Sequence, residues 1–215
     1  MLLAFDTSSP SVSVALLGGE VGDEVLVELT SEQEMRHGEQ LAPLIEQALE
    51  QAGASRLDLT AIGVGVGPGP FTGLRVGLVT ARTLGAVLDI PVYGVCSLDA
   101  LAVQAVAGGH LQEPFVVATD ARRKEVYLAS YDATATRLSG PAVDKPETVA
   151  TDLPVVGEGA LLYPDHFSRP VGPLRASAGW LGRAIAHEAA ELLDPEPLYL
   201  RRPDAEIPGA PKKVS

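Results

Sequence analysis

The stretch LLAFDTSSPSVSVALL, residues 2–17, opens the chain with two apolar runs separated by a polar turn. Residues 2–5 are continuously apolar, and after the turn Val12, Val14 and Leu16 alternate with smaller residues. Short apolar runs on either side of a turn rich in Asp, Ser and Pro are typical of a β-hairpin. We therefore predict a strand, a turn and a second strand, with Asp6 at the end of the first strand.

The same pattern returns 114 positions later in the chain. Residues 115–119 are predicted as a strand, Asp120 aligns with Asp6 without a gap, and residues 125–131 follow as a second strand. Two halves that open alike predict a duplicated unit, with a boundary near residues 107–112. We expect an N-terminal lobe over residues 1–107, a C-terminal lobe over residues 108–202 and a disordered tail over residues 203–215.

The remaining segments alternate between strand and helix patterns, which indicates an α/β fold. The first helix carries an apolar stripe at helical spacing and ends at Gly53. Strands are expected over residues 25–29, 61–66 and 91–95; helices over residues 37–52, 71–88, 97–106 (capped by Ser97) and 178–193 (capped by Ser177); and turn-rich stretches over residues 132–154 and 157–173.

Charge and composition limit the classes of function. The 215 residues include 16 basic and 28 acidic side chains, for a net charge of −12. That charge argues against tight unaided binding to nucleic acid. The single cysteine, Cys96, excludes an internal disulfide. The start has no basic segment of a secretory signal, and no apolar run approaches the roughly 20 residues that span a bilayer. We expect a soluble cytoplasmic protein that binds no membrane.

A glycine-rich stretch, GVGVGPGPFTGLRVG, occupies residues 63–77 at the junction of a strand and a helix. Such a turn can cradle phosphate on exposed N–H groups. This one lacks the Lys-Ser/Thr pair of a P-loop, and its two prolines remove donors. A tight strand-to-helix turn is therefore the favoured interpretation.

The helix over residues 71–88 is apolar on nearly every side. Gly73, Gly77, Ala81 and Gly85 lie four residues apart along one side, where a second helix could approach closely. Three glycines inside a helix cost about 1 kcal/mol each relative to alanine, so close packing must offset that cost. We favour a helix–helix contact with another chain, and burial within the same domain is the alternative.

Asp6, Thr7 and Ser8 could hold a metal ion or phosphates, as in actin-like ATPases, with Asp120 as the counterpart in the second half. The turn after Asp120 is ARRK, residues 121–124. Its long side chains would crowd a phosphate pocket, although their charge could contact phosphate from outside. The alternative is that both aspartates simply form turns.

His37 opens the first helix, and a helical metal site would need a second histidine four residues later. That position is Leu41, so we assign no metal ligand. No Gly-x-Ser-x-Gly elbow is present either, and we assign no catalytic residue. His37 is expected on an exposed or interface surface.

Taken together, these segments resemble the TsaB (YeaZ) family of bacterial proteins that make threonylcarbamoyladenosine in tRNA. The match extends nearly to Arg201, and Pro70 stands where the family usually has serine. The matching segments are DTS (6–8), RHGE (36–39), GPGPFTGLRVG (67–77), SLDAL (97–101), DAR (120–122), EVY (125–127) and PLYLR (197–201).

The resemblance implies an actin-like/Hsp70-like (ASKHA) fold of two ribonuclease-H-like lobes, with the last helix packing back on the first lobe. It implies a non-catalytic partner subunit that is required to form the threonylcarbamoyl group on adenosine in tRNAs that read codons beginning with adenine. The transferase would be TsaD, which would form a heterodimer with this chain. The ATPase TsaE would join them, and the chain alone would form a homodimer. Contact with tRNA would come only through the complex.

The resemblance also implies that the first two helices form the interface and that the chain has no cofactor of its own, with ATP or ADP at the complex interface. Asp6, Thr7, Ser8 and Asp120 would then be a vestigial nucleotide site. The rival hypotheses are an ATP-dependent kinase or phosphatase that uses Asp6 and Asp120, and a metalloprotease with bound metal. The interface residues expected are His37, Ala42, Pro43, Glu46, Gly73, Gly77, Ala81, Leu84 and Gly85.

Overall fold

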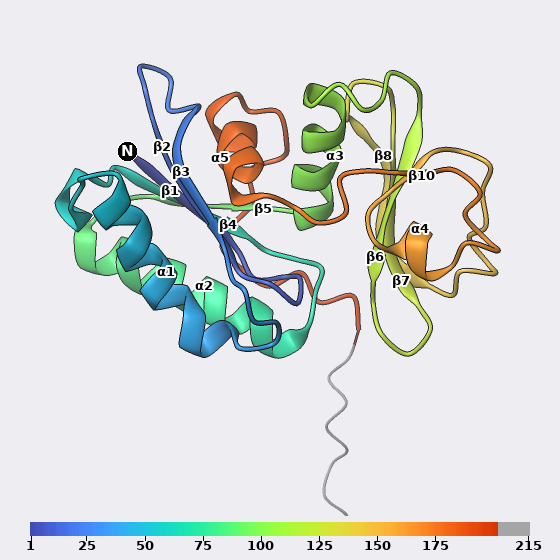
Figure 1. The fold of residues 1–215 in the computed structure, drawn as a ribbon, viewed down its shortest axis with the longest axis horizontal. Helices are drawn as coiled ribbons and strands as arrows, with labels where there is room; N and C mark the ends of the chain where they lie inside the picture. The colour runs from blue at the N-terminus through green and yellow to red at the C-terminus, as the bar shows by residue number, and fades with distance from the viewer. Residues whose placement is uncertain (202–215) are drawn as a thin grey trace, which may run out of the picture.

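The computed structural model describes residues 1–201, which form two lobes, each built around a five-stranded sheet (Figure 1). The expected tail over residues 203–215 lies outside the described residues. The first lobe contains β1 (Leu2–Asp6), β2 (Ser13–Gly18), β3 (Glu24–Thr30), α1 (His37–Gln51), a 3₁₀ turn (Arg56–Asp58), β4 (Ala61–Gly65), α2 (Phe71–Leu88) and β5 (Val92–Val95). The second contains β6 (Phe115–Asp120), β7 (Val126–Tyr131), β8 (Arg137–Asp144), β9 (Val155–Val156), α4 (Gly159–Leu162) and β10 (Pro170–Val171).

The two sheets have the same topology. The first has the order β3-β2-β1-β4-β5 and the second, read from the other edge, β8-β7-β6-β9-β10. In each, three antiparallel strands are followed by two parallel ones. Asp6 and Asp120 end the equivalent strands β1 and β6. The predicted duplication is therefore confirmed.

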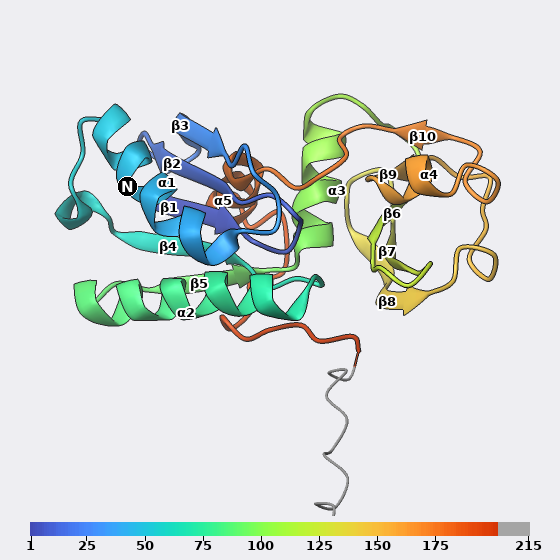
Figure 2. The same cartoon turned by 60° about the horizontal axis from the view of Figure 1, so that its bottom comes forward.

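Helices α1 and α2 lie side by side on one face of the first sheet (Figure 2). The stripe predicted for α1 is buried at Leu41, Ile45 and Ala48. Burying a leucine or isoleucine side chain stabilises the fold by about 1.5–3 kcal/mol, so these positions fix the face that α1 presents to the sheet. Gly53 adopts a φ of 63° after the helix, as expected of the residue that ends it.

Two further helices connect the lobes. α3 (Ser97–Ala107) stands between the two sheets, and Leu98 and Leu101 pack into the core of the second lobe. α5 (Ala178–Ala186) returns to the first sheet, on the face opposite α1 and α2, where Leu181 and Ile185 are buried. Ser177 caps α5 as predicted, because its hydroxyl accepts a hydrogen bond from the N–H of Trp180.

Three expectations about local structure are wrong. The stretch 132–154 contains β8, whose Gly140 and Pro141 imitate a turn; an edge strand tolerates proline because one side of it forms no ladder. α3 is preceded by Cys96 at its N-cap position, and the Ser97 hydroxyl points elsewhere. The helix expected over residues 178–193 ends at Ala186.

After α5 the chain runs as an extended strap, residues 188–201. Leu193 exchanges both backbone hydrogen bonds with Gly94, at 2.8 and 2.9 Å, and the N–H of Leu198 donates to the carbonyl of Val66 at 2.9 Å. Pairing with the first lobe thus replaces the helical bonds that the sequence predicted. The side chains of Leu193 and Leu198 pack against the cores of both lobes.

Candidate functional site

The Asp6 carboxylate is buried and held by its own chain. Its Oδ1 accepts hydrogen bonds from the N–H of Ser8 at 2.6 Å and the Ser8 hydroxyl at 2.5 Å. Its Oδ2 accepts one from the Ser97 hydroxyl at 2.6 Å. A Cβ on Gly65 would overlap the same oxygen, so β4 also closes over it. Asp6 therefore fastens the end of β1 to the start of α3.

Thr7 has a similar internal role. Its side chain is fully buried, and its Oγ1 donates to the carbonyl of Gly73 at 2.9 Å. That carbonyl belongs to the first turn of α2, so Thr7 holds the β1–β2 turn against α2. The glycine-rich segment before α2 is the tight turn that the sequence favours, since a Cβ on Gly69 would overlap the backbone of Ser8.

Asp120 faces the space between the lobes and pairs with its own turn. Its Oδ1 accepts the N–H of Arg122 at 2.8 Å, and its Oδ2 lies 3.2 Å from Nη1 of Arg122. Arg122, Arg123 and Lys124 all have positive φ angles, of 60°, 56° and 61°. This left-handed conformation costs a non-glycine residue roughly 1–2 kcal/mol. The β6–β7 turn is thus strained at three successive cationic residues.

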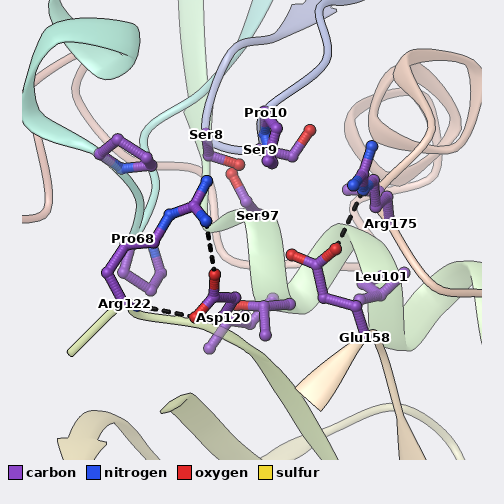
Figure 3. Close-up of a pocket in the computed structure, with 14 residues that line it drawn as sticks. Ser8, Ser9, Pro10, Pro68, Ser97, Leu101, Asp120, Arg122, Glu158 and Arg175 are labelled. Carbon is purple, nitrogen blue, oxygen red and sulfur yellow. Dashed lines mark hydrogen bonds and ion pairs between the residues drawn. The ribbon is translucent and has the colours of Figure 1, made fainter. Parts of the chain in front are cut away.

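A small cavity separates the lobes at this point (Figure 3). Its lining includes Ser8, Ser97, Asp120, Glu158 and Arg175. The volume is about 30 Å³, whereas small-molecule sites usually have about 300–1,000 Å³. The cavity therefore has no room for a nucleotide in this conformation.

The four residues expected to form a vestigial nucleotide site therefore do not lie in one pocket. Ser8 and Asp120 line the same cavity, but Asp6 and Thr7 are used in packing behind it. Within residues 1–201, no group of three or more His, Cys, Asp or Glu side chains is arranged to hold a metal ion.

Arg175 closes the cleft by bridging the lobes. Its Nε donates to Glu158 of the second lobe at 3.1 Å. Its Nη1 donates to Ser11 at 2.8 Å and to Glu34 at 2.9 Å, both in the first lobe. A charged group with partners on both sides holds the two lobes together across the cavity, as Figure 3 shows for the Glu158 pair.

The small-residue side of α2 packs inside the chain, which corrects the predicted contact with another molecule. A Cβ on Gly73 would lie 2.5 Å from the carbonyl oxygen of Thr7, and one on Gly77 would overlap Thr7 Oγ1. Gly85 meets Val92 of β5 in the same way, and Ala81 is fully buried. Close approach of α2 to its own lobe therefore offsets the helix-propensity cost of these glycines.

His37 is also buried, contrary to the expected position on an exposed or interface surface. Only 5% of it is accessible, and its Nε2 lies 2.7 Å from the carbonyl oxygen of Ser9. The ring fills the space that the missing side chain of Gly73 leaves, with atoms 3.3 Å from the Cβ position. Leu84 is half-buried against the core below the two helices.

Other residues of the two helices do face solvent. We call them the outer helical face: Ala42, Pro43 and Glu46 of α1 with Val79, Thr83 and Val87 of α2, all exposed. Val79 is 63% and Val87 75% accessible. The expected positions Ala42, Pro43 and Glu46 therefore lie where a partner could reach them.

The strap forms a second feature beside α2. Tyr199 stacks on Phe71 with ring centroids 5.0 Å apart, and Nε of Arg75 donates to its hydroxyl at 3.0 Å. A groove of about 510 Å³ lies between α2 and strap residues 196–199. Sequence reasoning missed this arrangement, because periodicity gives no signal for an extended strap. By length and composition α2 could also cross a membrane; in this structure one side of it packs against the core of the first lobe and the other side is exposed.

Sequence reasoning also missed a buried polar network between α3 and the second sheet. Asp99 accepts a hydrogen bond from the Tyr131 hydroxyl at 2.7 Å and pairs with Nη1 of Arg137 at 3.0 Å. Burial raises the pKa of Asp99, while the bond from Tyr131 and the charge of Arg137 oppose that shift. Burial likewise raises the pKa of Tyr131, so its hydroxyl stays protonated and donates. The neighbouring Cys96 is buried, which raises its pKa to about 12 and keeps it a thiol.

Comparison with known proteins places these features in a family. Residues 24–165 match the family model described as TsaD: tRNA N6-adenosine threonylcarbamoyltransferase. The chain is 41% identical to an uncharacterized protein of Mycobacterium tuberculosis, over 95% of this chain and 93% of the relative. It is 32% identical to the tRNA threonylcarbamoyladenosine biosynthesis protein TsaB of Escherichia coli, over 76% of this chain and 74% of that protein.

A solved structure agrees with the sequence matches. YeaZ from Pseudomonas aeruginosa superposes with a TM-score of 0.75 at 29% identity, covering 93% of this chain and 99% of that one. The expected actin-like/Hsp70-like fold class is thereby confirmed. The chain belongs to the TsaB (YeaZ) family of tRNA threonylcarbamoyladenosine biosynthesis proteins.

Proposed function

We propose that this chain is a non-catalytic partner subunit for making threonylcarbamoyladenosine in tRNAs that read codons beginning with adenine. In this role it binds and activates a TsaD transferase. The observation that carries the proposal is its family membership, through a relative named TsaB that matches three quarters of the chain. The cleft between the lobes supports the proposal, because the polar residues in and behind it bond to other protein groups: Asp6 and Thr7 serve internal packing, and Asp120 pairs with Arg122.

The outer helical face is the proposed docking surface for TsaD, and for a second copy when the chain is alone. Val79 and Val87 expose apolar side chains on a helix whose opposite side is already buried. Covering them would gain hydrophobic free energy, about 25 cal/mol for each Å² removed from water. Glu46 and Pro43 of α1 would form a more polar flank.

The remaining members of the assembly follow from the same proposal. TsaE joins the heterodimer, and ATP or ADP binds at the interface of the complex rather than in the 30 Å³ cleft of this chain. The complex acts in the cytoplasm. The net charge of −12 makes tRNA binding by the isolated chain weak and strongly salt-dependent.

Two substitutions test the docking surface. Val79→Glu with Val87→Glu is expected to weaken both self-association and TsaD binding by about 30-fold or more, because each carboxylate would have to be desolvated at the contact. The melting temperature should stay unchanged, since both side chains are already in solvent. Analytical ultracentrifugation with and without the TsaD homologue of the same organism measures both affinities.

Val21→Glu is the matched control. Val21 is 64% accessible, close to the 63% of Val79, but lies in the β2–β3 turn. It should leave both affinities intact. If the double variant binds TsaD like the parent chain, the outer helical face is not the docking surface.

A further inference from the structure

The groove between α2 and strap residues 196–199, which we call the strap groove, is framed by two polar bridges. At one end Nε of Arg75 donates to the Tyr199 hydroxyl at 3.0 Å, and at the other Nη1 of Arg82 pairs with Glu196 at 2.8 Å. Arg75 and Arg82 are seven residues apart, which is about 10 Å along a helix. The strap already engages both guanidinium groups, so the groove between the bridges offers mainly apolar contacts.

Apolar and aromatic side chains line the strap groove between these bridges. Leu78 and Val79 contribute from α2, and Pro197 and Tyr199 contribute from the strap. The volume of about 510 Å³ lies within the range of about 300–1,000 Å³ that is usual for sites that bury a ligand. The groove therefore has room for apolar side chains of a partner.

The strap side of the groove is held in place by backbone hydrogen bonds on both sides of Pro197. Before it, Leu193 exchanges two bonds with Gly94, and after it the N–H of Leu198 donates to the carbonyl of Val66. A surface that is already ordered loses less conformational freedom when a partner binds. The strap groove is thus preformed in the chain alone.

The outer helical face is too small to be a docking surface by itself. A stable protein–protein interface takes roughly 20–30 residues from each partner, whereas this face comprises six. Val79 and Thr83 belong to the face and also line the strap groove, so the two surfaces are continuous. A partner that covers the exposed side of α2 therefore reaches the groove without a gap.

A second groove borders the outer helical face on its other side, between α1 and the end of β3. Pro43 joins it to the face, but its other lining residues are largely glutamine, glutamate, serine and threonine. Interface centres are enriched in tyrosine and arginine and depleted in glutamate and serine. The strap groove contains Tyr199, Arg75 and Arg82. Its composition therefore favours extension of the docking surface towards the strap, which runs alongside α2 (Figure 2).

We propose that the strap groove is the second part of the docking surface for TsaD and that it receives an apolar side chain of that partner. The inference rests on the proposed function, which names TsaD as the partner and the outer helical face as the first part of the surface. Tyrosine side chains in well-packed pockets often carry a large share of the binding energy. Tyr199, which stacks on Phe71 and is 38% accessible, is the tyrosine placed to do so.

Truncation of Tyr199 tests the groove. Tyr199→Ala removes most of the strap side of the groove and should raise the Kd for the TsaD homologue of the same organism about tenfold or more. Tyr199→Phe keeps the ring and loses only the hydroxyl, so it should bind nearly as tightly as the parent chain. Loss of the ring stack should lower the melting temperature of Tyr199→Ala by about 1–6 °C. Calorimetric titration of the full chain is therefore done at a temperature at which every variant is folded.

Leu192→Ala is the matched control on the same strap. Leu192 is 39% accessible, close to the 38% of Tyr199, but it does not line the groove. It should leave the Kd for the TsaD homologue unchanged. Equal weakening by Leu192→Ala and Tyr199→Ala would show that any damage to the strap reduces binding, and would overturn the inference.

Photocrosslinking locates the occupant without reference to binding energy. The analogue p-benzoylphenylalanine is placed at position 199 in one variant and at position 192 in another, and each is irradiated with the TsaD homologue. A crosslink to TsaD is expected from position 199 and not from position 192. Crosslinks from position 199 only to a second copy of this chain, or only to residues 202–215 of the same chain, would identify a different occupant and overturn the inference.

The outcomes separate the strap groove from the proposed function. If Val79→Glu with Val87→Glu abolishes TsaD binding while Tyr199→Ala binds like the parent chain, the outer helical face remains the docking surface and the strap groove is excluded from it. If the parent chain does not bind the TsaD homologue at all, the proposed function and this inference both fail.

Discussion

Asp99→Ala is expected to lower the melting temperature by about 6–12 °C. The substitution leaves the fully buried Tyr131 hydroxyl without its acceptor and removes a carboxylate that pairs with Arg137. Breaking a buried ion pair from one side typically costs 3–5 kcal/mol. We expect a loss of about 3 kcal/mol in the free energy of unfolding, because the Arg137 side chain is 23% accessible and keeps its ion pair with Glu191 at 2.9 Å. At 2–4 °C per kcal/mol for a domain of this size, thermal melting detects the change easily.

A matched pair of controls isolates the buried charge. Glu113→Ala removes one partner of an exposed ion pair with Arg169 and should barely change the melting temperature. Asp99→Leu combined with Arg137→Met and Tyr131→Phe removes all three polar partners together and should recover part of the loss. A melting temperature for Asp99→Ala equal to that of the parent would contradict the role assigned to this network.

Gly77→Leu is expected to destabilise the fold by about 3 kcal/mol or more. A Cβ at this position already overlaps Thr7 Oγ1, and a whole leucine side chain would force α2 away from the β1–β2 turn. Overpacking a core typically costs 1–3 kcal/mol, and the Thr7–Gly73 hydrogen bond would be lost as well. Denaturant unfolding measures the free energy directly.

Val79→Leu is the control on the same helix. It also enlarges a side chain, but on the exposed outer helical face, and should leave the free energy of unfolding nearly unchanged. A Gly77→Leu variant that unfolds like the parent chain but no longer self-associates would show that the small-residue side of α2 forms the interface with another chain. The structure predicts the opposite result.

The duplicated architecture was predictable because its signals are local. An apolar run that ends at Asp6, and again at Asp120, specifies a strand, a turn and a returning strand without reference to distant residues. The same holds for α2, whose expected bounds, residues 71–88, agree with the structure. Local pattern and backbone preference agree in these segments, so sequence alone places them correctly.

The partners of each surface were not predictable in the same way. Gly73 and Gly77 indicate that another segment packs closely against α2. The sequence does not specify whether that segment belongs to another chain or, as observed, contains Thr7 of the same chain. Asp99 and Tyr131 are 32 positions apart in the sequence, so no local sequence pattern indicates their hydrogen bond. The strap likewise depends on the free edge of β5, which exists only once the sheet has formed.

The most direct test of the account is to omit this chain from a reconstituted reaction. The TsaD and TsaE homologues of the same organism are supplied with ATP, a threonylcarbamoyl donor and unmodified tRNA, and the modified nucleoside is quantified by mass spectrometry. Formation should fall at least tenfold without the chain, return when it is added, and be absent when the chain replaces TsaD. Full formation in its absence, or transfer by the chain alone, would contradict its proposed role as a non-catalytic partner subunit.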